Sequence, residues 1–396
     1  MDNPAPILHP DLYFRFFPDA AARRRWDNYF RYIQTHTELS AWLKSEWTDA
    51  LKYFRKILDE NFLKKADHPI TRLVTGLAIW QAEQLIDYSH TLQYLAGNDP
   101  DHIQLLNKLK SDDADTEAIP FLTIAHLIKG IGFLVRFPSE DPSHPNPDAV
   151  IADTDPRVIV YGEVSKLGDS DLRKAYSDNY YILDHILRQT LCNPLHSTQQ
   201  LTFLPEEQQA GLAAALEDLR DRVFDTQAPA DYEDPYLRIT LFPLEQEPVF
   251  NTWLQTADRR KGLNGPPLDY DETPRIAGNK LKREARQIPA GQPGLIFIPV
   301  RPLYFFHLHT DDTIRAFQYR LQHHPNIIGV YLFAEILLPS VSLHGFGRHA
   351  RFTETAVHGP LTRYSLFVRN EAYQANLPPE TLTRIYSIFD LSCTTV

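Results

Sequence analysis

The sequence contains very little sulfur. Cys192 and Cys393 are its only cysteines, and methionine occurs once among 396 residues. Two cysteines cannot build a disulfide framework or a four-cysteine zinc site, and so low a count is typical of proteins from a reducing compartment. The sequence thus excludes the disulfide-rich secreted and zinc-ribbon classes, and we expect a cytoplasmic protein.

Positive charge is also scarce. The chain has 40 Lys and Arg residues against 51 Asp and Glu residues, a net charge of −11. An acidic chain of this kind is not a general binder of polyanions. Any contact with nucleic acid would have to come from a local basic patch that overcomes the overall field.

Long apolar runs are missing as well. The longest run, from Ile327 to Ala334, is far too short to span a bilayer. The first residues, Met1-Asp2-Asn3-Pro4, show neither the basic region nor the apolar region of a secretory signal. We therefore expect no membrane association.

The composition is otherwise ordinary for a globular protein. Hydrophobic residues make up 43% of the chain, so a real core can form, and 396 residues exceed the size at which one core stops growing. Two domains are the natural expectation.

The N-terminal part shows the 3.6-residue period of amphipathic helices. One stripe at helical spacing consists of Leu43, Trp47, Leu51, Phe54 and Leu58. Further helices are predicted over 19–110, the third starting with Asp67 as its N-cap and ending near Gly97. We predict a helical domain over residues 1–115, bounded by the acidic run from Ser111 to Glu117.

Beyond this run the period changes to that of strands alternating with helices. Residues 116–396 are predicted to form an α/β domain with a mixed sheet flanked by helices, and with insertions at about 191–236 and 243–274. The predicted helices cover 118–132, 169–190, 205–224, 274–287 and 312–323, and the predicted strands cover 133–137, 148–152, 158–165, 237–242, 295–300 and 327–333.

A predicted hairpin carries the most informative pattern. Asp148 begins one strand, a turn follows at 153–157, and Glu163 stands near the end of the second strand. In an antiparallel pair with a short turn these positions can lie close together. Two converging carboxylates suit Mg²⁺, which binds through one or two carboxylates and retains water. The alternative is that Asp148 only starts a strand and Glu163 is exposed on an edge.

This arrangement resembles the PD-(D/E)XK nuclease superfamily. The predicted order of helix 118–132, strand, hairpin and helix is similar to the α-β-β-β-α core of that family, and the resemblance covers about residues 118–190. It implies a restriction-endonuclease-like fold in which Asp148 and Glu163 bind Mg²⁺ and a lysine two residues after the second carboxylate orients the attacking water.

Here the position of that lysine is occupied by Ser165. Side chains alternate along a strand, so Glu163 and Ser165 should share one face and Lys166 should point to the other. A replacement cation could come from Lys166 through a bulge, or from Arg173 or Lys174 on the next helix. The family's frequent acid on the first helix is absent from 121–125, and Glu117 precedes that helix.

A second feature is a predicted helix rich in positive charge. It contains Arg275, Lys280, Lys282, Arg283 and Arg286. The last four could form the local patch that nucleic-acid phosphates need. The alternative is a solvated helix face balanced by the acidic residues at 269–272.

Two functions fit these features. The first is metal-dependent hydrolysis of DNA or RNA phosphodiesters, of the kind found in bacterial DNA processing or defence. The second is a catalytically inactive nuclease-fold scaffold whose helical domain docks a partner protein. In that case Trp26, Trp42, Trp47 and Trp80 are candidate contacts, although core packing also explains them.

Overall fold

The computed structural model of the chain divides into two compact units. Unit 1 consists of Met1–Leu167 and Pro274–Val396, and unit 2 is the insertion Gly168–Thr273. The structure describes residues 10–114, 117–138, 147–153, 155, 157–167, 174, 195–202, 204–257, 259, 261–264, 272–300, 310–334, 338–339, 350–352, 356–357, 361–362 and 365–389. The two units are described separately below.

The N-terminal part of unit 1 is helical, as its period predicts. Its helices are α1 (Pro10–Phe16), α2 (Trp26–Thr35), α3 (Ala41–Leu58), α4 (Pro69–Gly76), α5 (Ile79–Asn98) and α6 (His102–Lys110). All five residues of the predicted α3 stripe are buried. Ser40 begins this helix by accepting a hydrogen bond from the Leu43 amide at 3.1 Å.

The third predicted helix is in fact two helices. Leu77, with φ of 55°, takes the left-handed conformation that ends α4, and α5 starts two residues later. The N-cap of α4 is His68 rather than the predicted Asp67. The spacing of apolar residues cannot reveal the break between α4 and α5, because apolar residues continue on both sides of it.

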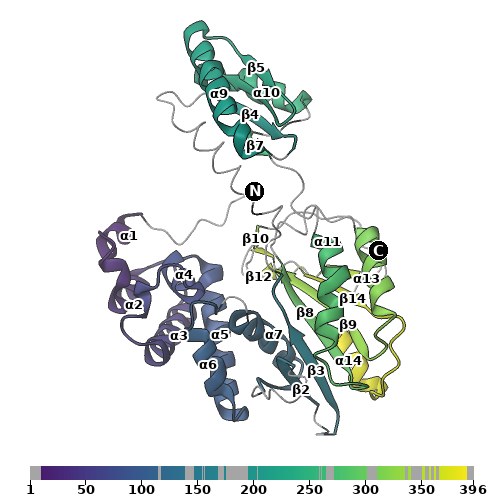
Figure 1. Cartoon of the computed structure of the whole chain (residues 1–396). Coiled ribbons are helices and arrows are strands. Elements are labelled where there is room, and N and C mark those ends of the chain that lie inside the picture. Colours follow the sequence, from purple (N-terminus) through teal and green to yellow (C-terminus); the bar gives the residue numbers. More distant parts are fainter. Residues whose placement is uncertain are drawn as a thin grey trace. The chain divides into compact units, whose positions relative to one another are not determined.

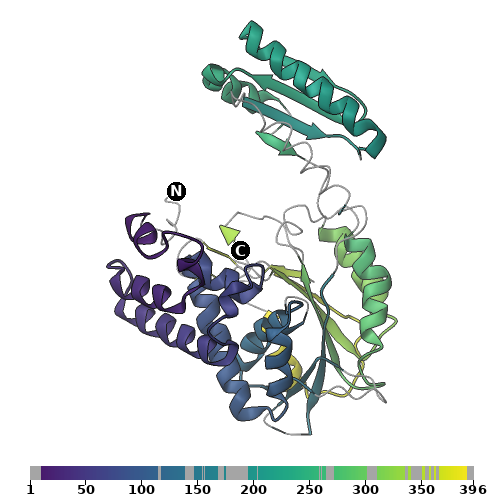
Figure 2. The same ribbon diagram turned by 60° about the vertical axis from the view of Figure 1, so that its left-hand side comes forward.

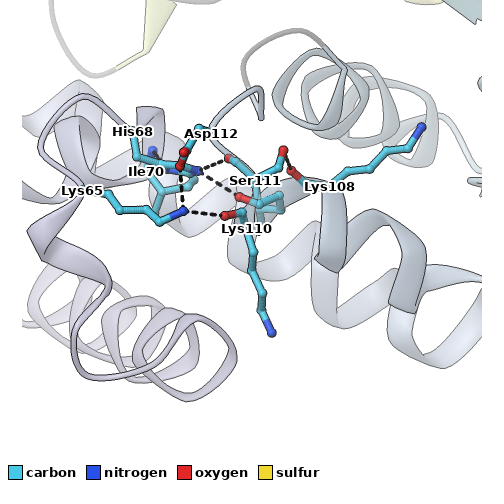
Figure 3. Close-up of polar contacts among 8 residues, drawn as sticks. Lys65, His68, Ile70, Lys108, Lys110, Ser111 and Asp112 are labelled. Atoms are coloured by element: carbon cyan, nitrogen blue, oxygen red, sulfur yellow. Dashed lines mark hydrogen bonds and ion pairs between the residues drawn. The ribbon is translucent and has the colours of Figure 1, made fainter.

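Ser111 and Asp112, at the start of the acidic run, are held against the helices (Figure 3). The His68 ring contacts the carbonyl oxygens of Leu109 at 2.9 Å and Ser111 at 3.1 Å through Nε2. The Lys65 ammonium pairs with Asp112 at 2.7 Å. These contacts tie the end of α6 and the first residues of the run to His68 and Lys65.

The central element of unit 1 is a mixed sheet. Its order is β1-β2-β3-β8-β9-β14-β11, with β3, β8 and β9 parallel and the other pairs antiparallel. The strands are β1 (Leu134–Arg136), β2 (Ala149–Ala152), β3 (Ile159–Val164), β8 (Gly294–Val300), β9 (Ile327–Ala334), β11 (Ala350–Phe352) and β14 (Ser365–Arg369). The predicted hairpin is present as β2 and β3.

Helices pack on both faces of this sheet (Figures 1 and 2). One face contacts α7 (Ala118–Gly130) and α14 (Pro379–Phe389), and its core continues without interruption into the N-terminal helices, from Phe17 to Ile385. The other face contacts a π-helical turn (Ile276–Lys280), α12 (Leu281–Ala285) and α13 (Thr310–Leu321), which form a second core. The predicted boundary near residue 115 therefore does not coincide with the division into units.

Unit 2 has a small sheet of its own. Its order is β5-β6-β4-β7, and α9 (Glu206–Thr226) and α10 (Glu247–Thr256) pack on it. The strands are β4 (Leu195–Gln200), β5 (Ala230–Glu233), β6 (Leu237–Phe242) and β7 (Gly262–Asn264). The predicted insertions at 191–236 and 243–274 fall almost entirely within this unit, while the predicted helix 169–190 lies outside the described residues except for Lys174.

Two further sequence expectations can be compared with the structure. Trp26 and Trp47 are fully buried, as core packing predicts, whereas Trp42 is 56% exposed and Trp80 is half-buried. Within the described residues, every helix is too short or too polar to cross a membrane.

Candidate active site

Asp148 and Glu163 meet at one end of the β2–β3 hairpin. Ala149 pairs with Gly162 in the antiparallel ladder. Asp148 precedes Ala149 and Glu163 follows Gly162, so these two residues stand beside each other. The Asp148 Oδ2 atom accepts a hydrogen bond from the Val164 amide at 2.8 Å. The hairpin thus brings together the two carboxyl groups that the sequence singles out.

The face of the sheet to which the Glu163 side chain points decides which residues surround it. Tyr161, two residues earlier, packs with the core beneath α12, and side chains two residues apart share a face. Ser165 follows the same alternation, and its hydroxyl donates a hydrogen bond to Glu284 Oε1 of α12 at 3.0 Å. Glu163 and Ser165 therefore share the face that contacts α12.

Lys280 supplies a cation at this face. Its ammonium donates hydrogen bonds to the Ser165 hydroxyl and to the Lys166 carbonyl at 2.9 Å, and it pairs with Glu284 at 3.3 Å. The side chains of Lys280 and Glu284 are only 9% and 3% exposed. Lys280 ends the π-helical turn before α12, and such turns often occur where a helix must re-aim a functional side chain.

The carboxyl groups are strongly coupled. Burial raises the pKa of Glu163 well above its usual range, and the nearby charges of Asp148 and Glu284 raise it further. Burial also raises the pKa of Asp148, whereas its hydrogen bonds with the Val164 amide and with Glu163 lower it. These signs are the ones expected when Glu163 carries a proton that it shares with Asp148.

Glu117, which the sequence places before the first helix of the core, acts on Asp148. Glu117 is the residue that precedes α7, and its charge helps to raise the pKa of Asp148. Its carboxylate forms an ion pair with Lys108 of α6, whose charge lowers the pKa of Asp148. The two members of this ion pair therefore have opposite effects on the pKa of Asp148.

The residues present fit a hard divalent cation. The Glu163 side chain is buried, and its Oε2 atom has no hydrogen-bond partner. Only a proton or a cation offsets the repulsion between carboxylates at such close range. No group of three or more His, Cys, Asp or Glu side chains that could hold a metal occurs among the described residues, so a bound Mg²⁺ would rely on Asp148, Glu163 and water.

The structure places the predicted cations differently from the sequence analysis. Lys166 contacts Lys280 through its main-chain carbonyl, and Lys280 itself belongs to the carboxylate cluster rather than to an exposed surface. Lys174 is an exposed residue of unit 2, and Arg173 lies outside the described residues. Lys282, Arg283 and Arg286 are exposed on α12 and its C-terminal end, as predicted.

Sequence reasoning missed Glu284 and the place of Lys280. One signal was available, because Lys280 and Glu284 are separated by four residues and such a pair shares a helix face. Nothing in the spacing indicated that this face packs on β3, since 115 residues separate Ser165 from Lys280. Only the parallel pairing of β3 with β8 brings α12 over Glu163.

Comparisons of this chain with protein-family models, with curated proteins and with solved structures found no match.

Proposed function

We propose that this protein is a metal-dependent phosphodiesterase of the PD-(D/E)XK type that cleaves DNA or RNA. One observation carries the proposal: the carboxyl groups of Asp148 and Glu163 converge beside the ammonium of Lys280 in a buried cluster. Buried titratable groups with strongly perturbed pKa values and specific charged partners are typical of functional sites.

The order of elements supports the same proposal. Helix α7 is followed by β1, β2 and β3, and α12 then leads into β8, which pairs in parallel with β3. This order is similar to the α-β-β-β-α core on which the family resemblance rests. Unit 2 is inserted between β3 and α12, so it interrupts the chain without disturbing the sheet.

Each residue has a distinct task in this proposal. Asp148 and Glu163 would hold the metal ion, which supplies an activated water and neutralises charge on the scissile phosphate when bound. The hydrogen bond from the Val164 amide orients the Asp148 carboxylate. Lys280 provides the positive charge that the Ser165 position lacks, and Ser165 and Glu284 hold its ammonium in place.

Burial lowers the pKa of Lys280, while the charges of Glu284 and Glu163 oppose this effect. An ammonium with few water contacts acts more strongly on nearby charge, because the local dielectric constant is low. A preorganised cation of this kind would orient the attacking water or stabilise the developing negative charge.

Cleavage assays on the full chain test the proposal. We expect cleavage of DNA or RNA with Mg²⁺ or Mn²⁺, and its loss in the Asp148→Asn variant. Asparagine retains an oxygen that can accept from the Val164 amide, so the hairpin should remain folded. Asp155→Asn in the exposed β2–β3 turn is the matched control and should retain activity. Activity that survives Asp148→Asn would refute the assignment.

A second candidate is a catalytically inactive scaffold. The observation that favours it is the deep burial of Glu163, which is 6% exposed, together with the ion pair between Lys280 and Glu284. Titration calorimetry with Mg²⁺ separates the two candidates. If the protein is a nuclease, the wild type should bind Mg²⁺ and Glu163→Gln should not. If it is a scaffold, the wild type should neither bind Mg²⁺ nor cleave nucleic acid.

A further inference from the structure

Exposed cations lie on α12 and on its neighbour α13. Lys282, Arg283 and Arg286 are exposed on α12 and at its C-terminal end. Helix α13 packs against α12 within one core, through residues such as Leu281 and Phe317. We call the region formed by Lys282, Arg283, Arg286, Tyr319, Arg320, His323 and His324 the α12–α13 surface.

The charge of this region differs in sign from that of the whole chain. Between Pro274 and Val300 there are five Lys or Arg residues and a single acid, Glu284. Between Thr313 and Phe333 there are two Arg residues, two His residues and no acid, and the two acids of α13, Asp311 and Asp312, stand in its first turn. Glu284 is buried in the candidate site, where it pairs with Lys280 and with Arg283. Another acid, Glu371, meets α13 at Gln318, where its amide donates to Oε1 at 3.5 Å.

His324 shows that the two elements contribute to one positive field. It lies in the turn after α13, and burial lowers the pKa of its imidazole. The charges of His323, Arg286 and Lys282 lower that pKa further. Lys282 and Arg286 of the α12 segment are therefore close enough to His324 to disfavour its protonated form, and a bound anion would favour that form.

An aromatic side chain stands among these cations. Tyr319 is 61% exposed, although burying a large ring is normally favourable. Its ring lies edge-on to His323 with centroids 5.6 Å apart, and the Arg320 guanidinium lies 5.7 Å from its centroid. Exposed aromatic rings between cations are typical of surfaces on which single-stranded nucleic acid stacks its bases.

The α12–α13 surface starts next to Lys280. At about 1.5 Å per residue, Lys282 lies about 3 Å and Arg286 about 9 Å farther along the helix axis. Lys282 and Arg286 are both exposed and stand four residues apart on one helix face, so one strand would contact both of them with its phosphates, whereas Lys280 is buried.

We propose that the α12–α13 surface binds single-stranded nucleic acid, with Lys282, Arg286 and the two histidines contacting phosphates and Tyr319 stacking on a base. This inference rests on the proposed function, since it assigns the path by which a substrate strand leaves the site. Arg283 is the cation closest in sequence to the cluster, and it also pairs with Glu284 at 2.7 Å.

The test uses the full chain and a fluorescently labelled oligothymidylate in buffer with EDTA, so that binding is measured without cleavage. Lys282→Glu with Arg286→Glu should weaken binding about tenfold or more and make the slope of log affinity against log salt shallower by about 1.4. Tyr319→Ala should weaken binding about fivefold or more with an unchanged slope, and Tyr319→Phe should not.

The matched control carries the same change in charge elsewhere. Lys56→Glu with Lys110→Glu alters two exposed lysines in the last turns of α3 and α6. It should leave the affinity within about twofold of the wild type, as expected for a non-contacting site. Thermal melts of every variant confirm that each remains folded.

The outcomes separate this inference from the proposed function. Equal binding by the two double variants would overturn the inference, while Mg²⁺-dependent cleavage by the wild type would leave the proposed function intact. Loss of binding in Lys282→Glu with Arg286→Glu, in a chain that never cleaves, would overturn the function alone. If Tyr319→Ala binds normally and polyglutamate competes as well as the oligonucleotide, the surface is a general anion site and the assignment to single strands is wrong.

Discussion

The ammonium of Lys280 donates a hydrogen bond to the hydroxyl of Ser165, which precedes it by 115 residues. Ser165 stands two residues after Glu163, where the PD-(D/E)XK resemblance expects the lysine. The positive charge is therefore present at the expected place but is delivered from the helix rather than from the strand.

This contact predicts that a lysine at position 165 can partly replace Lys280. Lys280→Ala should reduce cleavage by about 100-fold or more, because it removes a preorganised charge near the reacting phosphate. Adding Ser165→Lys to this variant should restore part of the rate, since the new side chain starts from the point that Lys280 contacts. Single-turnover rates measure both effects, and Lys56→Ala on α3 is the control. A double variant as slow as Lys280→Ala would contradict this replacement.

Metal binding should release protons. The pKa of Glu163 is raised by burial and by neighbouring carboxylates, and that of Asp148 is raised by burial, so protons must leave before both can bind a cation. We expect the apparent affinity for Mg²⁺ to rise with pH. Calorimetry in two buffers of different ionisation enthalpy measures the protons released. An enthalpy that does not depend on the buffer would contradict the coupling.

Glu163 should also make the metal-free protein less stable as pH rises. Its folded-state pKa lies above the ordinary value of 4.5, so its contribution is complete below that value and is lost as pH rises through the folded-state pKa. Glutamine imitates the protonated acid, so Glu163→Gln should gain stability relative to the wild type, by up to about 1.4 kcal/mol per pH unit.

Urea unfolding in EDTA at a series of pH values above 4.5 gives the difference in unfolding free energy between Glu163→Gln and the wild type. Glu38→Gln changes an exposed residue and serves as the control, which should follow the wild type. Parallel curves for Glu163→Gln and the wild type would show that Glu163 is not held in its protonated form.

His68 should make the fold sensitive to acid. Its Nδ1 accepts from the Ile70 amide at 3.2 Å, so the neutral ring carries its proton on Nε2, which donates to the Leu109 and Ser111 carbonyls (Figure 3). Burial lowers the pKa of this ring below 6.5. Its stabilisation is therefore fully present above pH 6.5 and is lost as pH falls from there through the lower folded-state pKa.

Protonation of the ring removes the acceptor for the Ile70 amide, which should cost about 1–3 kcal/mol. His68→Gln should be less stable than the wild type at neutral pH but lose less stability on acidification. Denaturant unfolding above and below pH 6.5 measures this, with His102→Gln as control, since that ring contacts the Asp99 carbonyl. Identical acid sensitivity in the wild type and His68→Gln would exclude the role of His68.

Local patterns predicted much of unit 1. The helical stripe of α3 and the strands β1, β2, β3, β8 and β9 follow from periodicity, as does β6 in unit 2, because the period reports which face is buried. The short strands β4, β5, β7, β11 and β14 and the helices α10 and α14 were missed. Their sequences are polar or short, so their packing partners, rather than their own patterns, decide their structure.

The sequence by itself determined the hairpin and its two carboxyl residues, because strand alternation and a short turn place Asp148 and Glu163 at one end. It also determined that Glu163 and Ser165 face the same way. The tertiary structure alone decided which groups meet them. Lys280 and Glu284 reach Glu163 because β8 pairs in parallel with β3, and Glu117 influences Asp148 because α7 packs on the opposite face. Spacing along the chain cannot reveal these contacts, because they depend on how separate elements pack.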